Sequence, residues 1–127
     1  MGTKSVLLCV ALALAGCAVS EEDRFQDQAQ RDIRASLKDP KSAKFRNLSV
    51  NPGLSGVRVV CGEVNSRNSF GGYTGFRPFV YWPGELAISQ GDGDRFVNEA
   101  ILGICTGDET LLKRQPAIAQ LLAKAKK

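Results

Sequence analysis

The chain has 127 residues with a formal net charge of +4, and 43% of its residues are hydrophobic. This length corresponds to one small domain, and the apolar fraction is high enough to build a single core. The mild positive charge, without a long basic run, argues against nucleic-acid binding. The chain contains no histidine, which removes the most common general base and a frequent zinc ligand.

The first 16 residues, MGTKSVLLCVALALAG, have the parts of an export signal. Lys4 provides the basic start, and the apolar run of about ten residues that follows is too short to span a bilayer, which needs roughly 20. The sequence LAGC at residues 14–17 resembles the lipobox of bacterial lipoproteins, in which the cysteine receives a diacylglyceryl group and palmitate. We therefore expect a cleaved signal peptide over residues 1–16 and lipidation of Cys17. The alternative is an ordinary secretory signal cleaved near Ala15 or Ala18.

The lipid anchor predicts where the rest of the chain lies. Residues 17–20 would form the lipid-anchored N-terminus, since two or three acyl chains hold a protein stably in a membrane. Ala18, rather than aspartate, follows the lipidated cysteine. By resemblance to enterobacterial sorting rules, this implies the outer membrane of a Gram-negative bacterium. Residues 21–127 would then form one periplasmic domain with a basic C-terminal tail.

Four cysteines are present, and the export signal accounts for two of them. Cys9 leaves with the signal peptide and Cys17 takes the lipid. Cys61 and Cys105 remain as a pair in an oxidising compartment, which favours a disulfide. The alternatives are a metal site or a nucleophilic thiol, but zinc sites use clustered Cys and His ligands and a catalytic thiol needs a base beside it.

The first predicted element after the signal is a helix over residues 21–38. Ser20 and the acidic residues after it form a helix start, and Asp39-Pro40 ends the helix. Its apolar stripe recurs every fourth residue, at Phe25, Ala29, Ile33 and Leu37.

Three strands are predicted next, over residues 44–50, 56–65 and 74–82, and a short fourth strand over 86–89. In the second strand Val57, Val59 and Cys61 share one face, while Val60 and Val64 share the other, which indicates a central position in a sheet. In the third strand Phe76, Val80 and Trp82 face one side, and Phe79 and Tyr81 the other. Pro78 lacks an N–H donor, so we expect an edge strand or a bulge there.

The C-terminal part is predicted to be helical. Asp94 would cap a helix ending at Cys105, with an apolar face formed by Phe96, Val97, Ala100, Ile101, Ile104 and Cys105. This places Cys105 within reach of a cysteine on the sheet. Residues 111–127 also read as helical, with Pro116 as a break or restart. The sum is an α+β domain of order α-β-β-β-(β)-α-α, with a small antiparallel sheet of three to four strands and the helices packed on one face.

The most distinctive loop, NSRNSFGGY, lies at residues 65–73. It is no phosphate cradle, because a strand follows it and no lysine follows its glycines. Asn, Ser and Gly indicate a hairpin loop. A hairpin turn does not require Arg67, Phe70 or Tyr73, and Arg and aromatic residues are enriched at binding hot spots. They are the candidate partner-binding residues; the alternative is that the aromatic rings fold back over the sheet.

The acidic residues suggest structural roles. Glu63 and Arg77 would be cross-strand neighbours in an ion pair. Asp92 and Asp94 lack the remaining ligands of a calcium loop, so a turn and a helix cap are favoured. The basic C-terminal residues could touch anionic headgroups or form a solvated tail; they are Lys113, Arg114, Lys124, Lys126 and Lys127. We predict no catalytic residues, no metal site and no cofactor.

The segments LAGC, LKDPKSAKFRNL and CGEVNSRNSFGGYTGFRPF occur together in this short chain. In this combination the chain resembles small lipoproteins of bacterial chromosomes and prophages, best over residues 37–79. The resemblance implies an envelope location and brings no catalytic residues. We therefore expect a lipid-anchored periplasmic protein, not an enzyme, that binds another envelope component, in the first place a protein. The prophage link suggests envelope protection or phage exclusion.

Two alternatives remain. One is an enzyme or enzyme inhibitor in cell-wall turnover, the enzyme acting through Glu63, Asp92 or Asp94. The other is a structural lipoprotein without a discrete site.

Overall fold

The computed structural model describes residues 16–54 and 56–125. Most of the predicted signal peptide lies outside this range, as do the last two lysines. The elements, in chain order, are α1 (Glu21–Ser36), the short 3-10 helix η1 (Pro40–Ser42), β1 (Lys44–Asn51), β2 (Val59–Asn65), β3 (Arg77–Trp82), β4 (Glu85–Ile88), α2 (Arg95–Thr106), α3 (Glu109–Arg114) and α4 (Pro116–Ala125). The predicted α+β class is confirmed, and the fourth strand is present. No helix within the described range is both long and apolar enough to cross a membrane.

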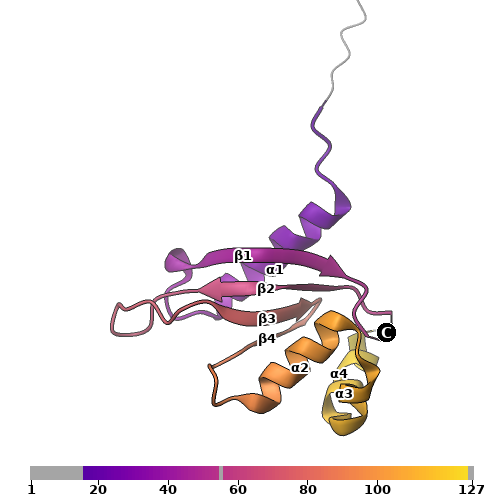
Figure 1. The fold of residues 1–127 in the computed structure, drawn as a ribbon. Coiled ribbons are helices and arrows are strands. Elements are labelled where there is room, and N and C mark those ends of the chain that lie inside the picture. Colours follow the sequence, from indigo (N-terminus) through magenta and orange to yellow (C-terminus); the bar gives the residue numbers. More distant parts are fainter. Residues whose placement is uncertain (1–15, 55, 126–127) are drawn as a thin grey trace, which may run out of the picture.

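The four strands form one antiparallel sheet in the order β1-β2-β3-β4 (Figure 1). A bulge interrupts β1 between Arg46 and Ser49, and Asn47 within it has a positive φ of 54°. Asparagine tolerates this left-handed conformation better than most residues.

At Pro78 the predicted edge is observed locally, because pairing with β4 does not reach it, whereas no bulge occurs there among the described strands and β3 as a whole is not an edge strand. β3 lies between two neighbours, and Pro78 pairs regularly with Glu63 of β2. Pairing with β4 starts only at Phe79. The missing N–H of Pro78 is tolerated because β4 has already ended beside it, where the Pro78 carbonyl accepts a hydrogen bond from the Ser89 N–H at 2.9 Å.

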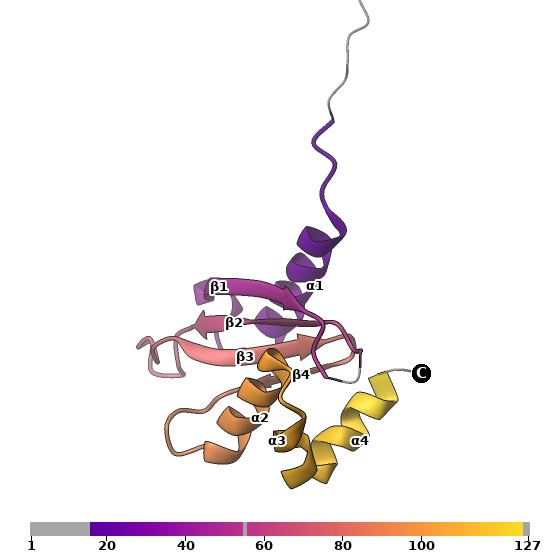
Figure 2. The ribbon, with the colours of Figure 1, turned by 45° about the vertical axis from the view of Figure 1, so that its right-hand side comes forward.

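The two main helices cover opposite faces of the sheet (Figures 1 and 2). On the α1 face the core contains Ala29, Ile33, Ala43, Val60, Val64, Phe79 and Tyr81. On the α2 face it contains Leu54, Val57, Val59, Cys61, Val80, Trp82, Ile101 and Ile104. The prediction that all helices pack on one face is therefore wrong. The predicted faces of the second strand and of Phe79–Trp82 in the third are confirmed, whereas Phe76 precedes β3 and is in neither core. Because β2 and β3 are apolar on both faces, each face needs its own cover.

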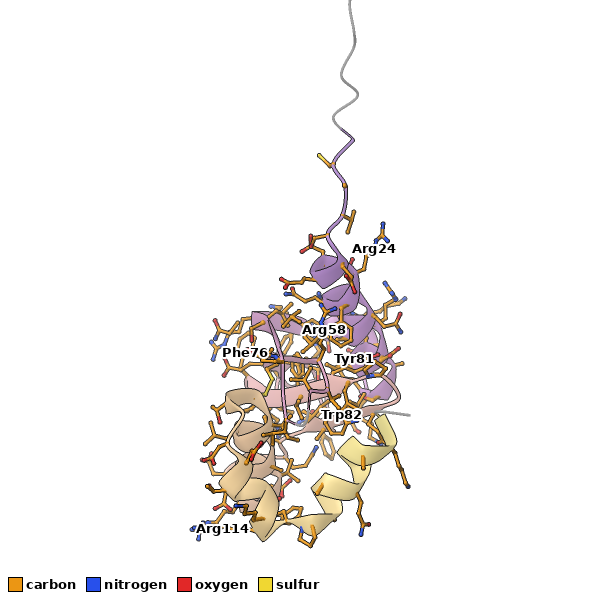
Figure 3. All side chains as sticks on the ribbon, turned by 90° about the vertical axis from the view of Figure 1, so that its right-hand side faces the viewer. Arg24, Arg58, Phe76, Tyr81, Trp82 and Arg114 are labelled. Carbon is orange, nitrogen blue, oxygen red and sulfur yellow. A yellow bond between two sulfur atoms is a disulfide. The ribbon has the colours of Figure 1, made fainter. Side chains whose placement is uncertain are left out.

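Helix α1 begins where its sequence signals predict, and it ends at Ser36, two residues before the predicted end at residue 38. Ser20 accepts a hydrogen bond from the Asp23 N–H at 3.1 Å and its own N–H donates to the Asp23 carboxylate, which completes a capping box. On the buried side, the Tyr81 hydroxyl of β3 donates to the Asp32 carboxylate at 2.7 Å. Figure 3 shows Tyr81 on the side of α1 and Trp82 on the side of the C-terminal helices.

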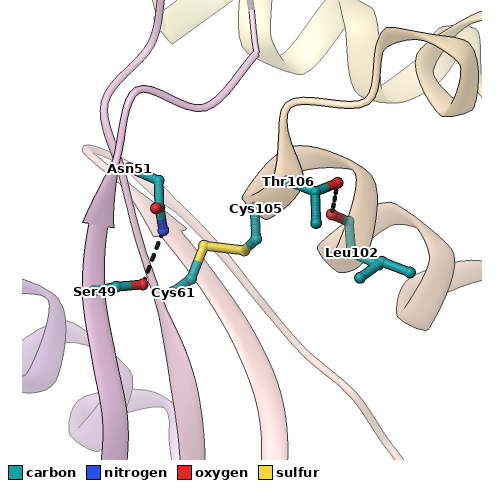
Figure 4. Close-up of a disulfide and its surroundings, with 6 residues drawn as sticks. All are labelled: Ser49, Asn51, Cys61, Leu102, Cys105 and Thr106. Atoms are coloured by element: carbon teal, nitrogen blue, oxygen red, sulfur yellow. Dashed lines mark hydrogen bonds between the residues drawn. A yellow bond between two sulfur atoms is a disulfide. The ribbon is translucent and has the colours of Figure 1, made fainter.

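The predicted disulfide is confirmed: Cys61 of β2 is bonded to Cys105 in the last turn of α2, with the two Cα atoms 6.1 Å apart (Figure 4). Two details of α2 differ from the prediction. Phe96 is 55% exposed and lies outside the apolar face, and Asp94 occupies the N-cap position without a side-chain hydrogen bond.

The C-terminal segment forms two short helices rather than one. Gly107 ends α2 in the left-handed conformation, with φ 73°, as is common for glycine at this position. Pro116 then starts α4, where its missing N–H is tolerated. The predicted restart at this proline is confirmed.

Candidate binding surface

The loop between β2 and β3 is held by its own hydrogen bonds, and Asn68 supplies most of them. The Asn68 side-chain oxygen accepts from the Phe70 N–H at 2.9 Å and from the Gly72 N–H at 3.2 Å. The Asn68 backbone N–H donates to the Gly72 carbonyl at 2.8 Å, and the Gly71 N–H donates to the Asn68 carbonyl at 3.0 Å. Gly71 has a φ of 83°, which favours glycine. The tip is therefore an ordered turn.

Further bonds hold the base of the loop to the body of the protein. Arg67 and Tyr73 form an isolated antiparallel bridge. The Arg67 N–H donates to the hydroxyl of Ser42, a buried residue of η1, at 2.8 Å. The Thr74 N–H donates to the Ser66 carbonyl at 3.1 Å. The loop extends beyond the end of the sheet (Figure 1), with its base fastened to the segment that follows α1.

All three predicted partner-binding residues are exposed, so the alternative that the rings fold back over the sheet is wrong. Phe70 is 97% exposed at the tip, and Tyr73 is 42% exposed. The Arg67 guanidinium carbon lies 5.3 Å from the centre of the Tyr73 ring, and the Lys44 ammonium lies 4.8 Å from it. Both distances are within the range of cation–π contacts. The structure thus brings Arg67 and Tyr73 together and leaves Phe70 without packing partners.

Lys44 is a part of this surface that the sequence analysis missed. It begins β1 and pairs with Asn65, the last residue of β2, which places it beside the base of the loop. To place Lys44 beside the loop one needs the pairing register of the first two strands, which cannot be read from the sequence. We call the exposed surface formed by Lys44, Arg67, Phe70 and Tyr73 the loop surface.

A groove of about 550 Å³ lies next to the loop surface, on the α1 face of the sheet. It is bordered by the end of α1 and its following residues, by the loop, and by β4 with the residues after it. The lining residues are Ser36, Leu37, Lys38, Val64, Ser66, Arg67, Asn68, Ser69, Thr74, Arg77, Leu86, Ile88 and Gln90. The groove is open because α1 ends at Ser36, before it covers this corner of the sheet.

The predicted ion pair of Glu63 with Arg77 is wrong. Glu63 instead accepts from the Arg46 guanidinium at 2.8 and 3.2 Å and from the Asn47 amide at 2.7 Å. The reason is the register: Glu63 lies opposite Pro78, and Arg77 lies opposite Val64. Neighbouring residues of a strand point to opposite faces, so Arg77 is directed away from Glu63.

The surroundings of Glu63 do not suit proton transfer near neutral pH. Hydrogen bonds from Arg46, and then from Asn47, hold the pKa of the Glu63 carboxyl below its usual value, because both donors stabilise the charged form. A general acid needs the opposite shift. Arg77 donates instead to the Gln90 side chain at 3.4 Å.

The other acidic candidates are not gathered into one site with Glu63. A second cavity, of about 440 Å³ on the α2 face, is lined by Asp92 but by neither Glu63 nor Asp94. Within the described part of the chain, no group of three or more Cys, Asp or Glu side chains is placed to hold a metal ion.

Comparisons with known proteins give no assignment. No family model matches the chain, and neither a curated protein nor a solved structure is significantly similar to it. The loop surface and the groove beside it are therefore interpreted from their own geometry.

Proposed function

We propose that this protein is a lipid-anchored component of the bacterial envelope that binds another envelope protein through the loop surface. The observation that carries the proposal is Phe70, which is 97% exposed at the tip of an ordered loop. A single exposed apolar residue is ordinary on a protein surface. Here, however, two backbone hydrogen bonds to Asn68 hold the tip in shape around a phenyl ring that packs against nothing.

This arrangement suits recognition for an energetic reason. Burying a phenylalanine side chain on binding contributes about 2–3 kcal/mol. An ordered loop loses little conformational entropy when it binds, so more of that energy remains as affinity. Tyr73 and Arg67, stacked beside the tip, add residue types that frequently dominate interface energetics.

The anchor is the second part of the proposal. Cys17 is a free, exposed thiol, four residues ahead of the first residue of α1, and the lipobox-like LAGC sequence ends on it. Acylation there would attach the protein to the outer membrane with its body in the periplasm, once residues 1–16 are removed. The loop is fastened through Ser42 to the segment after the other end of α1. The loop surface would therefore be directed away from the membrane that holds the lipid.

Such a surface could serve envelope protection or phage exclusion, as the prophage resemblance suggests. An inhibitor of a cell-wall hydrolase is a narrower form of the same proposal, because a protruding loop with an aromatic tip is shaped to enter a cleft. For an enzyme acting through Glu63, the lowered pKa of that carboxyl offers no support. Our proposal is accordingly a binding protein rather than an enzyme.

The decisive experiment compares capture of partners from crosslinked envelopes by the lipidated wild-type protein and two variants. Phe70→Ser removes the exposed ring at the loop tip. Phe96→Ser is the matched control, since it removes another exposed phenylalanine, on α2. We expect a partner that is captured by wild type and Phe96→Ser but lost with Phe70→Ser. Capture that also survives the triple change of Arg67, Phe70 and Tyr73 to alanine would contradict the loop assignment.

The anchor has its own test, by metabolic labelling with radioactive palmitate. We expect label on the wild-type protein and none on Cys17→Ser. Wild-type protein that carries no label and leaves the membrane fraction would rule out lipidation, without affecting the loop proposal.

A further inference from the structure

The groove next to the loop surface has an unbalanced charge. Lys38, Arg67 and Arg77 line it, and no aspartate or glutamate does. Within the described residues the ion pairs are Arg46–Glu63 and Arg58–Glu21, so none of the three groove cations is neutralised. Arg77 makes one long hydrogen bond to Gln90, at 3.4 Å, and Arg67 rests over the Tyr73 ring. Their remaining N–H donors are available to a ligand.

The floor of the groove is apolar. Leu37 contributes from the end of α1, Val64 from β2, and Leu86 and Ile88 from β4. Around this floor stand neutral hydrogen-bonding side chains, namely Ser36, Ser66, Asn68, Ser69, Thr74 and Gln90. A ligand that complements the groove therefore carries negative charge at its edges and an apolar group between them.

From this complementarity we infer that the groove binds an acidic peptide segment of the partner protein, with carboxylates on Lys38 and Arg77 and an apolar side chain on the floor. The inference rests on the proposed function and adds the chemistry of the partner. The volume of about 550 Å³ lies within the roughly 300–1,000 Å³ of small-ligand sites. It accommodates a few side chains, while the loop surface beside it contacts the rest of the partner.

Anionic lipid headgroups would satisfy the same cations, but the position of the groove favours a peptide. The groove lies at the C-terminal end of α1, and Cys17 precedes its N-terminal end. With 16 residues in α1 and a rise of 1.5 Å per residue, the two ends are about 24 Å apart. The groove is thus held at the end of the helix away from the lipid attachment.

The test uses the mature lipidated protein in a non-ionic detergent and a rhodamine-labelled octapeptide of alternating Glu and Leu. Binding is followed by fluorescence anisotropy. The groove variant is Lys38→Met with Arg77→Gln, which leaves the loop surface intact. The control variant is Lys113→Met with Arg95→Gln, which makes the same charge change on exposed residues of the C-terminal helices. We expect the groove variant to bind the peptide about tenfold more weakly than the control, as two surface ion pairs together would give.

Three further measurements decide the inference. The peptide with Lys in place of Glu should show no binding. Added salt should weaken the binding of the Glu-Leu peptide to the protein, because salt screens exposed charges. Equal peptide affinity in the groove and control variants would overturn the inference. Binding of the non-lipidated Cys17→Ser protein to phosphatidylglycerol vesicles, without detergent, that is lost when the groove substitutions are added, together with no peptide binding, would assign the groove to headgroups instead.

The loop and groove proposals fail separately. If Phe70→Ser loses the envelope partner while Lys38→Met with Arg77→Gln leaves peptide binding unchanged, the proposed function stands and the groove inference is wrong. If peptide binding depends on the groove cations but capture of the envelope partner survives the triple change of Arg67, Phe70 and Tyr73 to alanine, the groove inference stands and the loop assignment is wrong.

Discussion

Removal of the disulfide should cost a large share of the stability of this small domain. The bond joins Cys61 to Cys105, 44 positions apart in sequence. In the chain-entropy description, opening a loop of this length lowers the free energy of unfolding by about 4 kcal/mol. Domains of this kind are stable by only about 5–15 kcal/mol in total. The variant with alanine at both positions should therefore unfold at a markedly lower urea concentration, followed by the fluorescence of the single, buried Trp82.

Reduced wild-type protein separates loop closure from packing, because it keeps both cysteine side chains. If loop closure dominates, reduction alone should reproduce most of the 4 kcal/mol, and the alanine variant should lose at most about 1 kcal/mol more for the small gaps it leaves. A reduced protein whose free energy of unfolding stays within about 1 kcal/mol of the oxidised form would refute this reasoning.

Four other substitutions, one of them a control, test the packing, the α1–β3 contact and the loop. Gly62→Ala should destabilise the fold by about 1–3 kcal/mol in urea unfolding, because a Cβ there would meet atoms of β1 and β3 at 2.9–3.1 Å. Gly72→Ala, where the nearest atom is 3.9 Å away, should be nearly neutral. Burial, and to a smaller extent the hydrogen bond to Asp32, raises the pKa of Tyr81 from 10.0 to about 12. The Tyr81 hydroxyl therefore contributes its full share of stability below pH 10, and this share is lost as the pH rises through about 12. If the stability of Tyr81→Phe falls over this window as much as that of wild type, Tyr81 is not the titrating group. Asn68→Ala should speed hydrogen exchange at the loop-tip amides roughly tenfold, and unchanged exchange would show that the side chain does not hold the loop.

The start of α1 and the disulfide could be predicted from the sequence. Ser20 and Asp23 cap α1 because a capping box needs only residues three apart. Cys61 and Cys105 were paired by elimination and by the helical periodicity that put Cys105 on the core side. The exposure of Phe70 was one of two open possibilities, since an aromatic residue in a loop can cover the core or face solvent.

Features that depend on register or on the third dimension were missed. Glu63 pairs with Arg46 because the first two strands place these residues opposite each other, and the sequence does not state that register. Lys44 reaches the Tyr73 ring for the same reason. The placement of α1 and α2 on opposite faces could have been inferred, because Val60 and Val64 needed a cover that the disulfide-bonded helix cannot supply.

The end of α1 links these features into one functional region. The helix stops at Ser36, where Leu37 is extended, and the 3-10 turn that begins at Pro40 places the Ser42 hydroxyl where it accepts the Arg67 N–H. The same stop leaves the corner of the sheet uncovered, which creates the groove, and it positions Lys38 on the groove's rim. A longer helix would fill the groove and remove the support of the loop at once. The loop surface and the groove therefore both depend on where α1 ends, which is why we propose one partner for them rather than two.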